Sequence, residues 1–504
     1  MALYLNSLKL DRETGDSPTI VLNATDAQRE GINQADIVNF DSGEIAIFAV
    51  VEITDTEIPP GVVGVYEEIW TKYTLPNDTV IAISVMERPE SIEYIKKKLL
   101  GERLTEHELA VITKDISDRK IREVEIAYFM ATFFNPGFND EEVLSTIKGM
   151  ANAGDIMDFR NIRNNGNMVV DKHSIGGVAA KGVTPLLVPI IASFDLVIPN
   201  TSTRAITTPA GTTDILEVVM PVALNNDQLM DTVRKTGSCM VWGGALKLSP
   251  ADDVLITVER GLHVQSFQKL LVSIIAKKVS MGISHILIDI PYGPGTKVPN
   301  PDDVEVLKRG FIDLFSKVGI TCEVYSRMVC SPDGYGIGPA LEIRDILRVY
   351  ERDELRPRGL EETALRMAGQ LLEMTGTVEN GKGFESAREK LDSGAALEKF
   401  WEIAETQGAT KRINSSEIEL GEYQDTLKAP KSGKIEVVDN KEIVKVARAL
   451  GNPYIKNAGI FLNKTVGDTV RQGDELMTLY ATSADRLRTG LEASKVDKLF
   501  RIRD

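Results

Sequence analysis

The spacing of apolar residues changes along this chain, and the order of these changes constrains the fold more than any other feature. Within residues 1–88, short β-branched runs at 19–22, 45–51 and 80–85 lie between turn residues. Runs of this kind are typical of short strands. We therefore expect a small N-terminal β-barrel domain over residues 1–88.

Helical spacing replaces this pattern after residue 92. Thr105 and Glu108 form a capping-box pattern just before apolar residues at helical spacing, which predicts the start of a helix. We expect an all-α domain over residues 92–165, with a later helical return near 220–245.

From residue 168 onward, apolar runs alternate with amphipathic stretches. The runs 186–191 and 285–290 are expected to be strands or buried segments. Such alternation is typical of α/β domains, whose sites gather at the carboxyl ends of strands. We expect an α/β domain at 168–420 and, because turn-plus-strand units then return, a C-terminal α+β domain at 421–504. The fold class is thus a multidomain α+β protein.

The charge balance limits the class of partner. The chain has 504 residues and a net charge of −16. Nucleic-acid binding needs a basic footprint, so we expect no nucleic-acid partner. An anionic substrate must instead meet a locally basic pocket.

Cysteine and histidine usage argues against two kinds of site. Three cysteines make no disulfide framework in a chain this long, and with four histidines we predict no metal site. The N-terminus lacks the features of a secretory signal, and prolines interrupt the apolar stretch 183–199. We predict a cytoplasmic protein without a membrane partner.

The segment 170–177 concentrates polar groups more than most of the chain. Lys172 and Ser174 suit a phosphate oxyanion, and the backbone at Gly176 and Gly177 can approach an anion closely. His173 can hydrogen-bond a leaving group. The alternative is a glycine-rich turn with a solvated lysine and a packed histidine.

Three further elements follow along the chain. Residues 202–214 are rich in hydroxyl side chains and include an arginine and a glycine. The alternative is a loop whose hydroxyl groups hydrogen-bond only to the local backbone. Ser273 and Lys277 share a predicted helix face, where a solvated lysine is the alternative. The loop 292–297 follows a predicted strand, where an α/β protein places ligand contacts.

These four elements, in this order, resemble the thymidine phosphorylase family of nucleoside phosphorylases. Residues 171–177 are similar to the family's phosphate loop, and 202–217 resemble its signature. The N-terminal barrel resembles the extended branch that includes archaeal AMP phosphorylases, and the C-terminal segment resembles the family's barrel-sandwich domain. The resemblance implies phosphorolysis with inorganic phosphate as co-substrate, no bound cofactor, and a homodimer or larger homo-oligomer.

The resemblance also implies a role for each motif residue. Phosphate would be held by Lys172, Ser174, Ser202 and Thr212, together with the backbone at Gly176 and Gly177. His173 would contact the base and act with Lys172 in catalysis. The nucleotide site would be lined by Gly177, Thr203, Arg204, Ala205, Ile206, Thr207, Thr208 and Lys297, with Ser273 and Lys277 contacting the base, sugar or nucleotide.

Two positions depart from the family pattern. Gln265 stands where AMP phosphorylases of this branch have an aspartate proposed as the proton donor. An amide donates a hydrogen bond but delivers no proton, so Gln265 at the catalytic position favours a pyrimidine, which can leave as an anion. Val258 stands where the bacterial enzymes have a base-binding arginine, and Arg260 follows nearby.

Three hypotheses stay open on the sequence. The first is a phosphorylase that prefers a pyrimidine nucleoside or nucleotide and yields the free base and a pentose 1-phosphate. The second is an AMP phosphorylase that releases adenine and ribose 1,5-bisphosphate. The third is a nucleotide-binding paralogue without catalytic activity.

Overall fold

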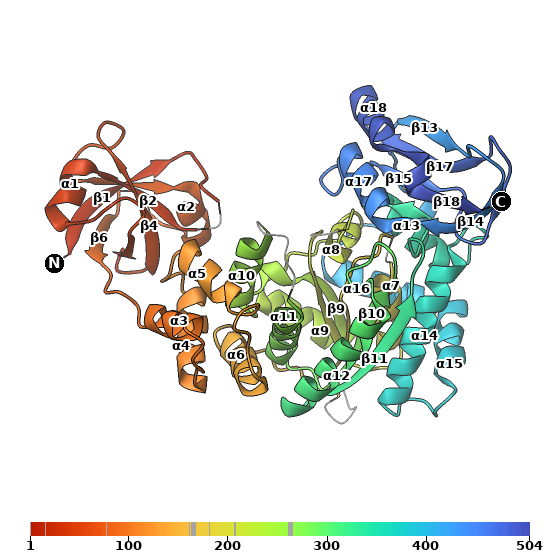
Figure 1. The fold of residues 1–504 in the computed structure, drawn as a ribbon, viewed down its shortest axis with the longest axis horizontal. Helices are drawn as coiled ribbons and strands as arrows, with labels where there is room; N and C mark the ends of the chain where they lie inside the picture. Colours follow the sequence, from red (N-terminus) through yellow and green to blue (C-terminus); the bar gives the residue numbers. More distant parts are fainter. Residues whose placement is uncertain are drawn as a thin grey trace. The chain divides into compact units, whose positions relative to one another are not determined.

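The chain forms two compact units, each built from two separate stretches of sequence. The computed structural model describes residues 2–503 except 16, 77, 161, 163–167, 181, 206–207 and 261–265. Unit 1 comprises Met1–Ile156 and Leu248–Ser280, and unit 2 comprises Met157–Lys247 and Met281–Asp504 (Figure 1).

Unit 1 begins with the predicted barrel. Its strands form a closed barrel in the order β1-β5-β2-β4-β3-β6. Inward-facing residues such as Leu5, Phe40 and Val51 fill its core, because alternate residues of a strand face opposite sides. The elements are β1 (Leu3–Leu10), β2 (Thr19–Asn23), α1 (Ala24–Glu30), β3 (Ile37–Asp41), β4 (Ala46–Thr54), β5 (Val62–Tyr66), α2 (Glu67–Tyr73) and β6 (Val80–Val85).

The rest of unit 1 is helical, and the predicted capping box is confirmed. Thr105 accepts from the Glu108 amide, and Glu108 accepts in return at the start of α4. The helical return is Leu248–Ser280, later in the chain than expected, since 220–245 lies in unit 2. The helices are α3 (Ser91–Leu99), α4 (Glu106–Ser117), α5 (Glu123–Ala131), α6 (Asp140–Asn152), α10 (Pro250–Arg260) and α11 (Phe267–Ser280).

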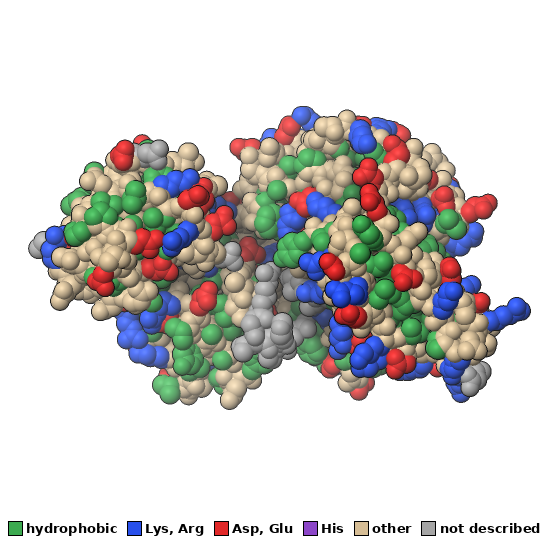
Figure 2. Space-filling view, turned by 90° about the horizontal axis from the view of Figure 1, so that it is seen from above, with side chains coloured by type: hydrophobic (Ala, Val, Ile, Leu, Met, Phe, Trp, Pro, Cys, Tyr) green, Lys and Arg blue, Asp and Glu red, His purple; other side chains and the backbone are tan. Residues whose placement is uncertain are grey.

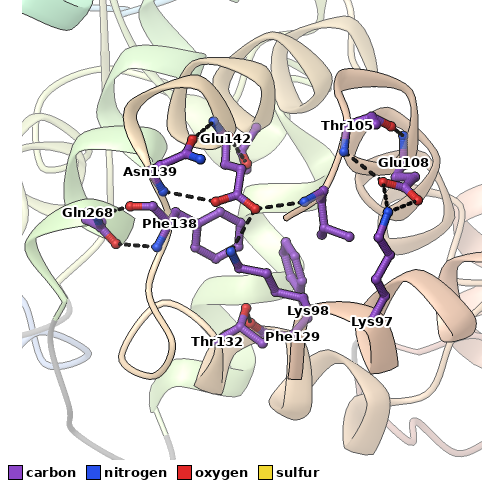
Figure 3. A network of polar contacts seen from close by, with 12 residues as sticks. Lys97, Lys98, Thr105, Glu108, Phe129, Thr132, Phe138, Asn139, Glu142 and Gln268 are labelled. Atoms are coloured by element: carbon purple, nitrogen blue, oxygen red, sulfur yellow. Dashed lines mark hydrogen bonds and ion pairs between the residues drawn. The ribbon is translucent and has the colours of Figure 1, made fainter. Parts of the chain in front are cut away.

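A buried ion pair fastens these helices together (Figure 3). Lys98 Nζ lies 2.7 Å from Glu142 Oε1, and both side chains are 3% exposed. The backbone amides of Leu104 and Asn139 also donate to the Glu142 carboxylate. The side-chain amide of Gln268, on α11, accepts a hydrogen bond from the Phe138 N–H at 3.1 Å and donates one to the Phe138 carbonyl oxygen at 2.7 Å. The helix that carries Ser273 and Lys277 is therefore anchored to the loop before α6.

The core of unit 2 is a parallel sheet. Strands β11 (Thr321–Met328), β10 (His285–Tyr292) and β7 (Val170–Ser174) pair side by side. A parallel bridge from Val169 to Val197 joins them to β8 (Ile198–Ser202), which pairs with β9 (Ser238–Trp242). The predicted phosphate motifs therefore end neighbouring parallel strands, so their loops leave the same edge of the sheet.

The run 186–191, expected to be a strand or a buried segment, is a buried helix. It lies in α7 (Val183–Ala192), in which every residue is buried. A continuous apolar run does not distinguish a buried strand from a buried helix, so the sequence left both alternatives open. Around the sheet lie α8 (Thr212–Leu216), α9 (Asn226–Thr236), α12 (Pro301–Lys317), α13 (Pro339–Tyr350), α14 (Arg358–Met374), α15 (Gly383–Asp392) and α16 (Ala395–Thr406), with α7 packed against α14 and α16.

The C-terminal part of unit 2 contains two small sheets. Their strand orders are β12-β15-β17-β13 and β16-β14-β18. The elements are β12 (Gly336–Ile337), β13 (Tyr423–Lys428), β14 (Gly433–Val438), α17 (Asn440–Leu450), β15 (Gly459–Leu462), β16 (Thr469–Val470), β17 (Glu475–Ala481), α18 (Ala484–Ala493), α19 (Val496–Leu499) and β18 (Phe500–Arg503). Ala179 and Ala180, just after the predicted phosphate motif, pack in the apolar core that these C-terminal elements form.

The surface of the protein carries charges of both signs (Figure 2). On the face shown in Figure 2, acidic side chains are interspersed with Lys and Arg. Among the described residues, no helix is long and apolar enough to cross a membrane.

Candidate active site

The loop after β7 lies against the loop that carries Lys297. Gly176 and Gly177 have φ values of 86° and 93°, in the left-handed region that glycine adopts without strain. The Gly176 amide donates to Ser174 Oγ at 3.3 Å. A Cβ atom added to Gly177 would lie 2.5 Å from the backbone nitrogen of Lys297. The structure thus brings together two motifs that are far apart in sequence.

Lys172 is buried beside a carboxylate of the neighbouring strand. Its Nζ lies 3.9 Å from Asp289 Oδ2 and 3.3 Å from Thr184 Oγ1. Asp289 also lies 3.5 Å from Arg327 Nε, and Arg327 forms a bidentate pair with Asp333 at 2.6 and 2.7 Å. These carboxylates raise the pKa of the Arg327 guanidinium although burial opposes them. Lys172, within β7, therefore lies in a chain of alternating charges with Asp289, Arg327 and Asp333.

The second motif folds around one carboxylate. Asp214 Oδ2 accepts from the amides of Ala205 at 2.7 Å and Gly211 at 2.8 Å. Gly211 is needed at this close approach, because an added Cβ would lie 2.2 Å from the carbonyl oxygen of Thr203. Ser202 Oγ lies 2.8 Å from Thr213 Oγ1, next to Thr212, the first residue of α8.

Arg204 is held by carboxylates within this loop. It bonds Glu217 at 2.7 and 2.9 Å and Asp214 at 3.2 Å, and its guanidinium stacks over Trp242. The hydrogen bonds from Arg204, together with Lys456, outweigh burial and lower the pKa of Glu217 to about 2. Arg204, which the resemblance assigns to the nucleotide site, is therefore bound to carboxylates of its own motif.

The two residues that the resemblance places at the base, sugar or nucleotide lie on α11, in unit 1. Ser273 Oγ donates to Asp252 Oδ2 at 2.6 Å, and Lys277 Nζ lies 2.8 Å from the same oxygen. Both residues are partly exposed on a helix that is otherwise mostly buried. The predicted shared helix face is confirmed by this common partner. Gln265, Ile206 and Thr207 lie outside the described residues.

Two stretches of the sequence match known families. Residues 166–319 match the glycosyl transferase family, a/b domain, and residues 434–499 match the pyrimidine nucleoside phosphorylase C-terminal domain. An AMP phosphorylase of Pyrococcus furiosus is 39% identical over 95% of this chain and 93% of its own length. One of Methanococcoides burtonii is 36% identical over 94% and 93%. The chain belongs to the thymidine phosphorylase and AMP phosphorylase family.

As a member of this family, the protein is an enzyme of the nucleoside phosphorylase type. The anthranilate phosphoribosyltransferase structure of Thermus thermophilus matches with a TM-score of 0.50 at 16% identity. That match covers 62% of this chain and 98% of the other, and it shows a shared fold.

The family motifs are supported by residues that the sequence did not single out. Asp289 faces Lys172, and Asp252 joins Ser273 to Lys277. Asn440, from the C-terminal domain, accepts from the Ala179 amide at 3.0 Å. Its backbone nitrogen would lie 3.3 Å from a Cβ added to Gly295. Their partners are distant in sequence, so no local pattern could have identified them.

Proposed function

We propose that this phosphorylase catalyses reversible phosphorolysis of a pyrimidine nucleoside or nucleotide, yielding the free base and a pentose 1-phosphate. The observation that carries the proposal is the close contact between Gly177 of the phosphate loop and Lys297. Lys172 lies in β7, just before the loop whose Gly177 approaches the loop of Lys297, so both motifs bring a cationic residue to this region, as an anionic co-substrate beside a nucleotide requires.

The proposed mechanism uses positioning and charge. Lys172 and Ser174, with Ser202 and Thr212, hold inorganic phosphate for attack on the anomeric carbon, while His173 supports the departing base through a hydrogen bond. Phosphate is the co-substrate and the reaction requires no bound cofactor. We propose that the enzyme acts in the cytoplasm as a homodimer or larger homo-oligomer.

Gln265 supports the pyrimidine preference. A purine leaves more readily when it is protonated, and an amide delivers no proton. A pyrimidine can leave as an anion whose carbonyl oxygen accepts hydrogen bonds. We expect Gln265→Asp to raise the turnover of AMP selectively. The measurement is kcat/KM for AMP and for UMP, and an unchanged ratio would remove this argument.

A second candidate is AMP phosphorylase. The relatives that are 36–39% identical over nearly the whole chain carry this name, which favours AMP as the substrate. The two candidates predict different products, adenine in one case and a pyrimidine base in the other.

A base-release assay separates the candidates. The purified protein is incubated with phosphate and, in turn, thymidine, uridine, cytidine, UMP, CMP and AMP, and the free base is quantified. The proposal predicts fastest release from a pyrimidine substrate. Fast turnover of AMP alone would establish the second candidate instead.

A further inference from the structure

A basic pocket on α14 and α15 of unit 2 shares no residue with the segments that the family motifs assign to the substrate. The two helices pack side by side (Figure 1), and their side chains, with those of the loop before α14, line a pocket of about 310 Å³. A volume of roughly 300–1,000 Å³ is typical of small-molecule sites. Four arginines line this pocket: Arg356, Arg358, Arg366 and Arg388.

The two glutamates of the pocket already have cationic partners. Glu361 lies 2.8 Å from Arg352 and accepts a hydrogen bond from Arg356 at 2.7 Å, and Glu362 accepts one from Arg366 at 2.6 Å. Arg356 also donates through Nη1 to two backbone carbonyl oxygens, and its side chain is only 15% exposed. Its Nη2 group makes no hydrogen bond with another described residue. Arg356 is therefore fixed in position and keeps unused donors.

The other arginines of the pocket have weaker partners or none. Arg358 is exposed and forms no ion pair within the part of the chain that the structure describes. Arg388 lies 3.4 Å from Glu385, which is itself 63% exposed, and a surface pair of this kind contributes little. The Arg388 guanidinium lies over the Phe384 ring, 4.6 Å from its centroid. Such stacking uses the flat face of the guanidinium and leaves N–H groups at its edge for an anion.

We propose that this pocket binds a ligand that carries two or more phosphate groups, at a site separate from the predicted phosphate loop. Arginine forks pair with phosphate oxygens through two parallel hydrogen bonds. The available donors come from the loop before α14 (Arg356), the start of α14 (Arg358) and α15 (Arg388). Because they approach from three elements, one phosphate group does not engage all of them. Free polyphosphate and nucleoside triphosphates share the required chemistry.

The test is isothermal titration calorimetry of the full chain with tripolyphosphate, ATP and inorganic phosphate in turn. Lys172→Met serves as the background, to weaken binding at the predicted phosphate loop. We expect tripolyphosphate to bind more tightly than inorganic phosphate. Combining Arg358→Ala with Arg388→Ala should raise the Kd for tripolyphosphate about 10-fold or more, because it removes charge-assisted hydrogen bonds.

Arg488→Ala is the matched control. Arg488 also pairs with an exposed carboxylate three residues away, that of Asp485 at 3.2 Å, but it lies on α18. Its loss should leave the Kd for tripolyphosphate within about 2-fold. If the double variant does not fold, as judged by its melting temperature, Arg358→Ala alone decides, because Arg358 is exposed and has no ion pair to lose among the described residues.

The ATP arm distinguishes the two sources of phosphate groups. Equal affinities for ATP and tripolyphosphate would show recognition of the phosphates alone, and tighter binding of ATP would show that the nucleoside contributes. Either result supports the inference when the arginine variants weaken both ligands.

Hydrogen exchange locates the site. Tripolyphosphate should slow the exchange of amides in α14 and α15, and the arginine variants should abolish this effect. Binding of tripolyphosphate no tighter than that of inorganic phosphate, a folded double variant with unchanged Kd, or protection confined to residues 170–177 would overturn the inference. None of these results depends on which base the enzyme releases.

Discussion

At the scale of single residues, Gly177 determines how closely the phosphate loop approaches the loop of Lys297. Gly177→Ala would place a Cβ atom 2.5 Å from the Lys297 nitrogen at a φ of 93°. We expect the strain to displace the loop and to lower kcat/KM for phosphate by about 10-fold or more, which corresponds to roughly 1.4 kcal/mol.

Gly319 provides a control that separates the effect of backbone strain from that of a steric clash. Gly319 also has a positive φ, of 78°, but an added Cβ would meet no atom within 4 Å. Gly319→Ala should therefore leave the steady-state kinetics for phosphate unchanged. Equal activity of the two variants would show that the contact between Gly177 and Lys297 does not shape the phosphate site.

The pH dependence of stability tests the role of the Glu217 charge in the second motif. Arg204 and Lys456 lower its pKa from an ordinary value of 4.5 to about 2. A depressed carboxylate pKa adds stability above pH 4.5, and this stability is lost as the pH falls toward 2. Thermal unfolding from pH 7 down to pH 2 should therefore show wild type and Glu217→Gln converging at acid pH. The difference at neutral pH should be at most about 3 kcal/mol, and a constant difference would contradict this role.

A local pattern in the sequence singles out the residues of the predicted phosphate motif, but not the residues that contact them. Lys172 and Gly177 lie together in a polar, glycine-containing segment, so a local pattern reveals them. Asp289 and Asp252 act on partners of other strands and helices, and nothing in their neighbours along the chain marks them. Contacts of this kind arise only when the chain is folded.

At the scale of elements, local patterns predicted several strands and a helix start. The β-branched runs became β2, β4 and β6 of the closed barrel, and Thr105 with Glu108 begins α4. For the run that lies in α7, the sequence left a strand or a buried segment open, because a continuous apolar run carries no period that distinguishes a helix from a strand. Its burial was predictable, whereas its secondary structure was not.

The buried pair of Lys98 and Glu142 tests how the helices of unit 1 are held together. Lys98→Met would leave the Glu142 carboxylate buried without its cation, which typically costs about 3–5 kcal/mol. Hydrogen exchange of the α3 and α6 amides should therefore become faster. Adding Glu142→Gln should restore most of the protection, because a neutral amide is cheaper to bury.

The neighbouring pair provides the control. Lys97 Nζ also lies 2.7 Å from a carboxylate, that of Glu108, but its side chain is 31% exposed. Water screens such a pair, so Lys97→Met should change protection by less than about 1 kcal/mol. Similar effects of the Lys97 and Lys98 variants would show that burial of the ion pair is not what stabilises these helices.

At the scale of the whole molecule, the discontinuity of the units was the least predictable feature. The chain leaves unit 1 after Ile156 and returns at Leu248. The sequence suggested a return near 220–245, since amphipathic helices occur in both stretches. Helical periodicity shows that a segment is amphipathic but not which core it packs against. Which of the two units a segment joins therefore depends on its packing against residues distant in sequence.

We propose that Lys172 of β7, with the loop that follows it, supports phosphorolysis of a pyrimidine nucleoside or nucleotide. The most direct measurement is phosphate-dependent release of uracil from uridine and UMP by the wild type and by Lys172→Met. We expect release of the base with an equal amount of pentose phosphate product, and a fall of about 100-fold or more in kcat/KM for phosphate in the variant. Base release that does not depend on phosphate, or that Lys172→Met leaves unchanged, would contradict it.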